Sequence, residues 1–251
     1  MKGKNRMNYL QDYFAFLEGK LKDAAATQEE NLNKAADQIL ESVCNGGHFY
    51  VFGSGHSHMV AEELYTRAGG LMFVKAILPP ELMLHQMYGK STNLERLPGY
   101  AKAILDLYPI CEKDTLLIIT NSGRNAVPIE MCMEAQKKGA KVIAMTSIRH
   151  SSGVTSRHAS GKRLFEIADI VLDNQAELGD ASFEIDGAGA PVGGISDFIG
   201  IALAQALAVI TTAKIVEMGK RPPVLRSANV DQGEEYRRLM QEFIEEWGIT
   251  R

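Results

Sequence analysis

Short, continuous apolar runs alternate along this chain with longer segments of helical periodicity. Strands that are apolar throughout are buried on both faces, which is typical of a parallel sheet covered by helices. The pattern therefore predicts an α/β fold, doubly wound, with a parallel sheet between two helical layers. The five expected strands are residues 48–52, 73–77, 116–120, 142–145 and 170–172.

Helical spacing of apolar residues first predicts one or two helices over residues 8–45. Asn45-Gly46-Gly47 should end them, because glycine readily takes the left-handed conformation found at helix ends. Residues 78–98 are expected to be irregular. Further helices are expected at 58–68, 100–108, 127–138 and 195–218.

No linker is evident, so residues 1–251 are predicted to form a single domain. Its parts would be the N-terminal helices over 8–45, a core over about 46–220 and a C-terminal segment over 221–251.

The charge balance gives no sign of a nucleic-acid partner, since 27 Lys and Arg residues stand against 31 Asp and Glu. The most apolar run, residues 199–210, is shorter than the about 20 residues that cross a bilayer, and is interpreted as a buried helix. No apolar stretch follows the basic start, so no signal peptide is predicted. Cys44, Cys111 and Cys132 are expected to be buried, reduced thiols. A cytoplasmic protein without membrane contact is predicted.

The first polar loop, Gly53-Ser54-Gly55-His56-Ser57, lies between a predicted strand and a predicted helix. Glycines allow close backbone approach, and the helix start offers unpaired N–H groups and a positive dipole end, which suits an anion. The loop lacks the Lys-Ser/Thr of a Walker motif, and the third glycine of the dinucleotide fingerprint would fall at His58. The alternative is a tight turn that needs glycine only for its shape.

The second polar loop, Thr120-Asn121-Ser122-Gly123-Arg124-Asn125, follows the third predicted strand in the same way. Ligands of parallel sheets bind beyond the carboxyl ends of the strands, and both loops belong there. Hydroxyls, amides and a guanidinium together suit a phosphate and sugar hydroxyls. The two loops predict a site for a phosphorylated sugar.

The two motifs of the sugar isomerase (SIS) domain, roughly GxGxSxxxA and SxSGxTxE, resemble GSGHSHMVAEELYTRAGG and TNSGRNAVPIEMCMEAQKKGAKVIAMTS. The similarity covers about residues 35–220. It implies a five-stranded parallel sheet of the flavodoxin or Rossmann type, and ligand contacts at Ser57, Thr120, Ser122 and Asn125, where Asn125 replaces the usual threonine. It also implies a homodimer or higher even oligomer whose partner completes the pocket.

The whole pattern is similar to an uncharacterised, phosphoheptose-isomerase-like bacterial branch of SIS proteins. The SGR of the second loop, Glu95 and the stretch KIVEMGKRPPVLRSANVD resemble N-acetylmuramic acid 6-phosphate etherases. The first loop, with Arg67, is more like 3-hexulose-6-phosphate isomerases. Phosphoheptose isomerases and the etherases typically carry a proton-transferring glutamate at the position of Arg67.

Aldose–ketose isomerisation needs a base that moves a proton between neighbouring carbons and a donor for the oxygens. Glu63 is the first candidate base, with Glu62 on the other side of the helix's apolar stripe and a solvated helix face as the alternative. Glu95 is the second candidate base, and His56 can reach a ligand from inside the first loop. Glu130 is expected at the surface or an interface.

Arg67 and Arg124 are expected to pair with phosphate or sugar oxygens, although Arg67 could instead join a subunit contact. A metal on His56, His58 and Glu62 would lack a fourth ligand, so no metal site is expected. His150 has no supporting context. The segment GDASFEIDGAGAPVGGISD is expected to close over the substrate with polar residues Glu184, Asp186, Ser196 and Asp197.

Three functions remain open from the sequence. The leading one is a cofactor-free phosphosugar isomerase working through an enediol. The others are an etherase or lyase acting on a phosphorylated amino sugar, which the C-terminal resemblance favours, and a non-catalytic phosphosugar sensor, which Arg67 favours.

Overall fold

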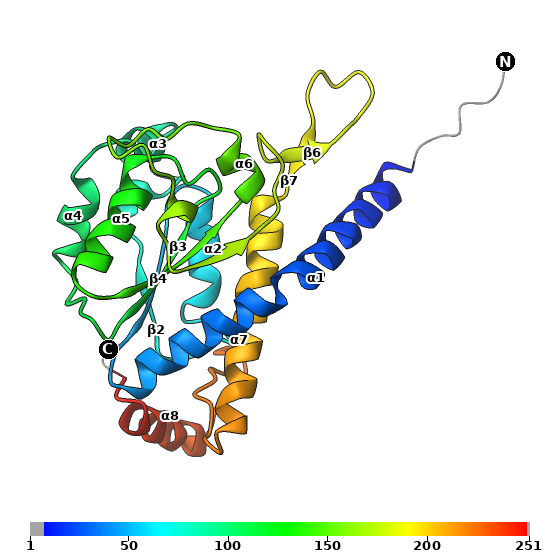
Figure 1. Cartoon of the computed structure of the whole chain (residues 1–251). Coiled ribbons are helices and arrows are strands. Elements are labelled where there is room, and N and C mark those ends of the chain that lie inside the picture. Colours follow the sequence, from blue (N-terminus) through cyan, green and yellow to red (C-terminus); the bar gives the residue numbers. More distant parts are fainter. Residues whose placement is uncertain (1–7, 250–251) are drawn as a thin grey trace.

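A computed structural model of the chain describes residues 8–249 and shows a five-stranded sheet between helical layers (Figure 1). All neighbouring strands are parallel, in the order β2-β1-β3-β4-β5. Each predicted strand agrees with an observed one to within one residue at either end, which confirms the α/β prediction. The strands are β1 (Phe49–Gly53), β2 (Val74–Ile77), β3 (Thr115–Ile119), β4 (Lys141–Thr146) and β5 (Ile170–Asp173).

Helices cover both faces of the sheet and form two hydrophobic cores. The larger core joins the sheet to α1 (Tyr9–Cys44), α2 (Ser57–Leu64), α7 (Ser196–Glu217) and α8 (Glu234–Glu246). The smaller core joins it to α4 (Tyr100–Leu105) and α5 (Ala126–Lys137). Short elements complete the chain: η1 (Pro80–Leu82), α3 (Lys90–Glu95), α6 (Ile148–Ser152), η2 (Leu164–Glu166), and the antiparallel pair β6 (Ala181–Phe183) and β7 (Val192–Gly194).

Where one or two N-terminal helices were predicted, the structure has one long helix, α1. Its first half extends beyond the body of the molecule beside the β6–β7 hairpin (Figure 1). Residues 78–98, predicted to be irregular, contain η1 and α3. Of the three cysteines predicted to be buried, Cys132 is buried, Cys111 is partly exposed, and Cys44, the last residue of α1, is exposed.

Helix α2 is shorter than the predicted helix 58–68 and ends at Leu64. Tyr65 is extended, and Thr66 takes the left-handed conformation with φ of 49°, so the helical path is broken there. Arg67 therefore lies outside the helix.

Helix α7 has 22 residues, so it is longer than the apolar run on which the prediction rested. It is the one helix within residues 8–249 that is long and apolar enough to span a membrane. Its buried side chains, among them Ile199, Leu203 and Leu207, belong to the larger core, and it packs against α1 and α2. This packing matches the predicted buried helix.

The first polar loop requires glycine at its entry. A Cβ atom on Gly53 would lie 2.3 Å from the carbonyl oxygen of Ser57, whereas one on Gly19, within α1, would meet nothing within 4 Å. We expect Gly53→Ala to lower the melting temperature, because the loop must shift. We expect Gly19→Ala to raise stability by about 0.5–1 kcal/mol, since alanine is the better helix former. Thermal unfolding of both variants checks this, and a neutral Gly53→Ala would contradict it.

Candidate functional site

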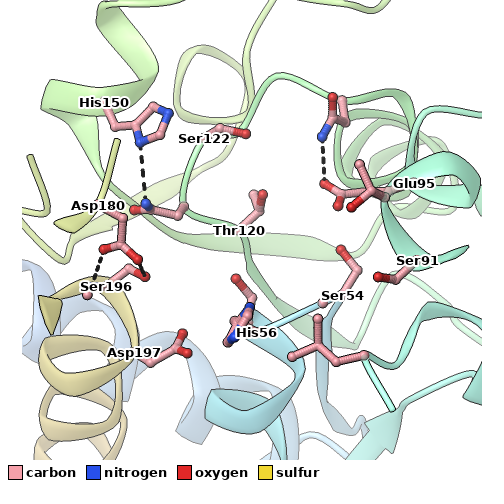
Figure 2. Close-up of a pocket in the computed structure, with 17 residues that line it drawn as sticks. Ser54, His56, Ser91, Glu95, Thr120, Ser122, His150, Asp180, Ser196 and Asp197 are labelled. Atoms are coloured by element: carbon pink, nitrogen blue, oxygen red, sulfur yellow. Dashed lines mark hydrogen bonds between the residues drawn. The ribbon is translucent and has the colours of Figure 1, made fainter. Parts of the chain in front are cut away.

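A cavity of about 490 Å³ lies at the carboxyl edge of the sheet, where the two polar loops meet. Register explains the meeting: β1 and β3 are direct neighbours, and Gly53 pairs with Ile119, so both strands end at the same level. Figure 2 shows the polar side chains around this space. The lining residues are Ser54, Gly55, His56, Ser57, Leu84, Ser91, Thr92, Glu95, Thr120, Asn121, Ser122, Asn125, His150, Asp180, Gly194, Ser196 and Asp197.

The loops place hydrogen-bond donors around the cavity. Ser54 and Thr120 are buried at its floor, and α2 and α5 begin at its edge. Within residues 8–249, the backbone N–H groups of Ser122 and Gly123 find no protein acceptor. Free N–H groups next to a helix N-terminus attract an anion. The second loop therefore offers hydrogen-bond donors that suit a negatively charged group.

One wall of the cavity carries a single carboxylate, Glu95, at the end of α3 (Figure 2). The side chain of Asn125 donates to Glu95 Oε1 at 3.1 Å, and the Ser54 hydroxyl also acts to lower the pKa of Glu95. Burial raises the pKa of Glu95, while these two groups and nearby arginines act in the opposite direction. A partly buried carboxylate of this kind suits proton transfer.

The opposite wall comes from α6, the β6–β7 hairpin and the start of α7 (Figure 2). Asp180 accepts hydrogen bonds from the Ser196 backbone at 2.7 Å and from its hydroxyl at 3.0 Å. Burial lowers the pKa of His150 and raises the pKa of Asp197. Sequence reasoning expected Ser196 and Asp197 near the substrate, gave His150 no role, and missed Asp180.

Ser91 and Thr92 were missed as well, because the segment around them was expected to be irregular and α3 presents them to the cavity. No local pattern marks such residues. Asp180 could have been found from its place in the glycine-rich segment already expected to close the site.

Glu63, the first candidate base, does not line the cavity. Its carboxylate is paired with Arg67 and accepts a hydrogen bond from Gln205 of α7 at 2.9 Å. Helical geometry placed Glu63 beside the buried stripe correctly, but the packing of α7 turns it away from the loops. Arg67 is likewise remote, so the structure does not bring the expected pair to the site.

Three further residues of the loops, Gly53, Gly123 and Arg124, do not contribute to the lining. Arg124 instead donates to the Thr155 hydroxyl at 3.3 Å. Glu184 and Asp186 lie exposed on the hairpin and also outside the cavity. Glu130 accepts from the Gly99 backbone at 2.7 Å and has a structural role.

Across residues 8–249, no group of three or more His, Cys, Asp or Glu side chains could hold a metal ion. His58 is buried and lies 3.6 Å from Glu62, while His56 is exposed at the cavity. The two histidines and Glu62 therefore do not form the metal set considered from the sequence.

Comparison with known proteins agrees with this fold. The SIS domain model matches residues 12–147, more than half of the chain. A UPF0309 protein of Halalkalibacterium halodurans is 53% identical over 234 residues, which cover 93% of this chain and 97% of that protein. This chain therefore belongs to the SIS domain family and, within it, to the UPF0309 proteins.

Solved structures are similar in fold at low sequence identity. A phosphoheptose isomerase from Neisseria gonorrhoeae has a TM-score of 0.56 at 18% identity, covering 82% of this chain and 97% of that one. A phosphoheptose isomerase from Francisella tularensis has a TM-score of 0.54 at 20% identity, covering 84% and 100%. These likenesses confirm the predicted architecture.

The raised pKa of Glu95 predicts a pH-dependent stability. Because the pKa of Glu95 is higher in the folded than in the unfolded protein, Glu95 contributes to folding stability while it is protonated. This contribution is fully present below pH 4.5, the unfolded-state pKa, and is lost as the pH rises through the folded-state pKa. Glu95→Gln, which removes the buried charge, should raise the melting temperature at about pH 8 and change it little at about pH 4.

Thermal unfolding across this pH range is the measurement. Glu29→Gln, at an exposed position of α1, is the matched control and should give no pH-dependent gain. A lower melting temperature for Glu95→Gln at the higher pH would count against a buried, unfavourable charge.

Proposed function

We propose that this protein binds a phosphorylated sugar and isomerises it between aldose and ketose forms without a cofactor. The observation that carries the proposal is the convergence of two donor-rich loops on one polar cavity that also holds a partly buried carboxylate. The chain's membership of the SIS domain family supports it, and the fold neighbours named as phosphoheptose isomerases agree with it.

The phosphate group belongs at the second loop. Its N–H groups, the hydroxyls of Thr120 and Ser122, and the positive end of α5 supply donors there. Ser54, Gly55 and Ser57 of the first loop then face the sugar hydroxyls. Gly53, Gly123 and Arg124 act behind this layer, by shaping the loops.

Glu95 is the proposed base. It removes the proton from the carbon beside the carbonyl group, which leaves an enediol, and returns that proton to the neighbouring carbon. The second proton moves between the two oxygens, where His56 or His150 can donate and accept. Burial favours this role, because a base works best when its pKa approaches the working pH.

The etherase or lyase reaction stays the second candidate. The observation in its favour is Glu95 itself, because elimination beside a carbonyl group starts with the same proton removal and the resemblance to the etherases includes this residue. The binding-only alternative is favoured by the Glu63–Arg67 pair, which leaves α2 without a carboxylate for the cavity.

A panel of hexose, heptose and amino-sugar phosphates tests the three functions together. Ligands are first found by thermal stabilisation, and products are then identified by chromatography and NMR. Isomerisation of a ligand supports the proposal, release of lactate from a lactyl-bearing amino sugar supports the etherase, and tight binding without turnover supports a sensor.

Two variants test the proposed roles of Glu95 in turnover and of Ser122 in ligand binding. Glu95→Gln should bind the ligand within a few-fold of wild type and lose turnover by about a hundredfold or more, because general-base contributions reach this size. Ser122→Ala should weaken binding about tenfold, the scale of one hydrogen bond to a charged group. Ser152→Ala, exposed at the end of α6, is the matched control. Full turnover by Glu95→Gln would exclude this carboxylate as the base.

We also propose that the protein is cytoplasmic and forms a homodimer or a higher even oligomer. The support is a set of exposed apolar side chains on two long helices, α1 and α7. These residues are Tyr9, Leu10, Phe14 and Leu21 on α1, and Phe198, Val209 and Val216 on α7. Large exposed apolar patches are typical of protein interfaces.

Light scattering should give wild type a mass of at least about twice the chain mass of 27.5 kDa. Replacing Leu10 and Phe14 with glutamate should lower that mass, because both face outward on one side of α1. Leu107→Glu, at an exposed position after α4, should leave it unchanged. A monomeric wild type would defeat the oligomer proposal without touching the ligand site.

A further inference from the structure

A chain of three side chains leads from the cavity to an exposed loop. Arg157 Nη1 donates to Asn125 Oδ1 at 3.0 Å, and Asn125 Nδ2 donates to Glu95 Oε1 at 3.1 Å. Asn125 is buried, whereas Arg157 is exposed in the segment between α6 and η2. Figure 2 marks the bond that reaches Glu95.

The two hydrogen bonds that join Arg157, Asn125 and Glu95 have a fixed donor–acceptor direction. A guanidinium group can only donate hydrogen bonds, so Asn125 must turn its Oδ1 toward Arg157. The NH₂ group then necessarily points to Glu95, which accepts. Rotating the amide by 180° would set donor against donor at Arg157 and acceptor against acceptor at the ionised Glu95, so both bonds would be lost.

Arg157 is itself held in place. Its backbone N–H donates to the Arg124 carbonyl at 2.7 Å, which ties the exposed loop to the second polar loop. Among residues 8–249, Arg157 makes no salt bridge. Its guanidinium group donates instead to the amide oxygen of Asn125. Its position is thus not explained by an ordinary surface ion pair.

We propose that Arg157 is a positioning residue: it fixes the orientation of the Asn125 amide and, through it, the orientation and protonation of Glu95. The inference deepens the proposed function, because it assumes that Glu95 is the proton-transferring group. Arg157 lies outside the cavity lining and acts only through Asn125.

Four groups around Glu95 set its protonation. Asn125 comes from the start of α5, Ser54 from the first loop, Arg96 from the end of α3, and Arg157 from the loop after α6. All four lower the pKa of Glu95 against the dominant effect of burial, which raises it. Without Arg157 the amide is free to rotate and present Oδ1 to the carboxylate, which favours the protonated acid.

The test follows the titration of Glu95 directly and needs no substrate. In protein labelled with ¹³C at glutamate carboxyl carbons, the Glu95 signal is the one that Glu95→Gln removes. Arg157→Ala should move the titration midpoint of Glu95 upward, and Arg157→Lys, which keeps a charged donor, should restore part of the difference.

Arg96→Ala is the matched control, because it also removes a cation beside Glu95 but no hydrogen bond to Asn125. Its effect should be smaller and should fade at about 1 M salt, where the screening length falls to about 3 Å. The effect of Arg157→Ala should persist. Equal shifts of the Glu95 titration midpoint in both variants, equally weakened by salt, would mean that Arg157 acts only through its charge. That result would overturn the proposal.

A double-mutant cycle with Asn125→Ala tests whether Arg157 affects the Glu95 titration through Asn125. When the amide is absent, Arg157→Ala should shift the Glu95 titration no further than Arg96→Ala does. An undiminished shift would mean that Arg157 does not act through Asn125. Circular dichroism of each variant verifies that the fold is intact.

If the panel identifies an isomerised sugar, Arg157→Ala should lower kcat about tenfold, with KM within a few-fold of wild type and the pH profile displaced in the same direction as the titration. If the panel finds no turnover, the proposed function fails while the titration still decides the role of Arg157. An unchanged pH profile in an active enzyme would overturn the positioning role.

Discussion

The parallel pairing of β1 with β3 is the interaction on which the site depends. Gly53 stands opposite Ile119, so the chain leaves both strands at one level and both following loops turn over the same space. Helices α2 and α5 then begin at the cavity, and each brings the positive end of its dipole to it. A shift in this register would separate the loops without changing either sequence motif.

The site works against the stability of the fold. Ser54, Thr120 and Asn125 are buried although they are polar, and Glu95 is held where its charged form is disfavoured. Among the residues that the structure describes, 8–249, the N–H groups of Ser122 and Gly123, just before α5, have no protein partner. Two hydrophobic cores, one on each face of the sheet, offset this loss. Such a distribution is expected where a ligand completes the hydrogen bonding.

Sequence periodicity predicted the five strands and the meeting of the two loops, because strand runs and glycine-containing turns are local patterns. The same reasoning failed at Glu63. The 100° step along a helix placed that side chain relative to its neighbours, but not relative to Gln205, which lies 142 residues away along the chain and bonds it. His150 reaches the cavity only through the placement of α6, and no local pattern encodes that placement.

Asn125 needs different hydrogen-bond partners from the threonine that is usual at its position. A threonine, the residue usual at this place in the SIS motif, offers a hydroxyl that rotates freely and can both donate and accept. An amide has a donor end and an acceptor end fixed on opposite sides, so its usefulness depends on which end faces the carboxylate. In this chain the acceptor end faces a guanidinium that can only donate, and the donor end faces Glu95. The substitution and the distant arginine are therefore best understood as one structural unit.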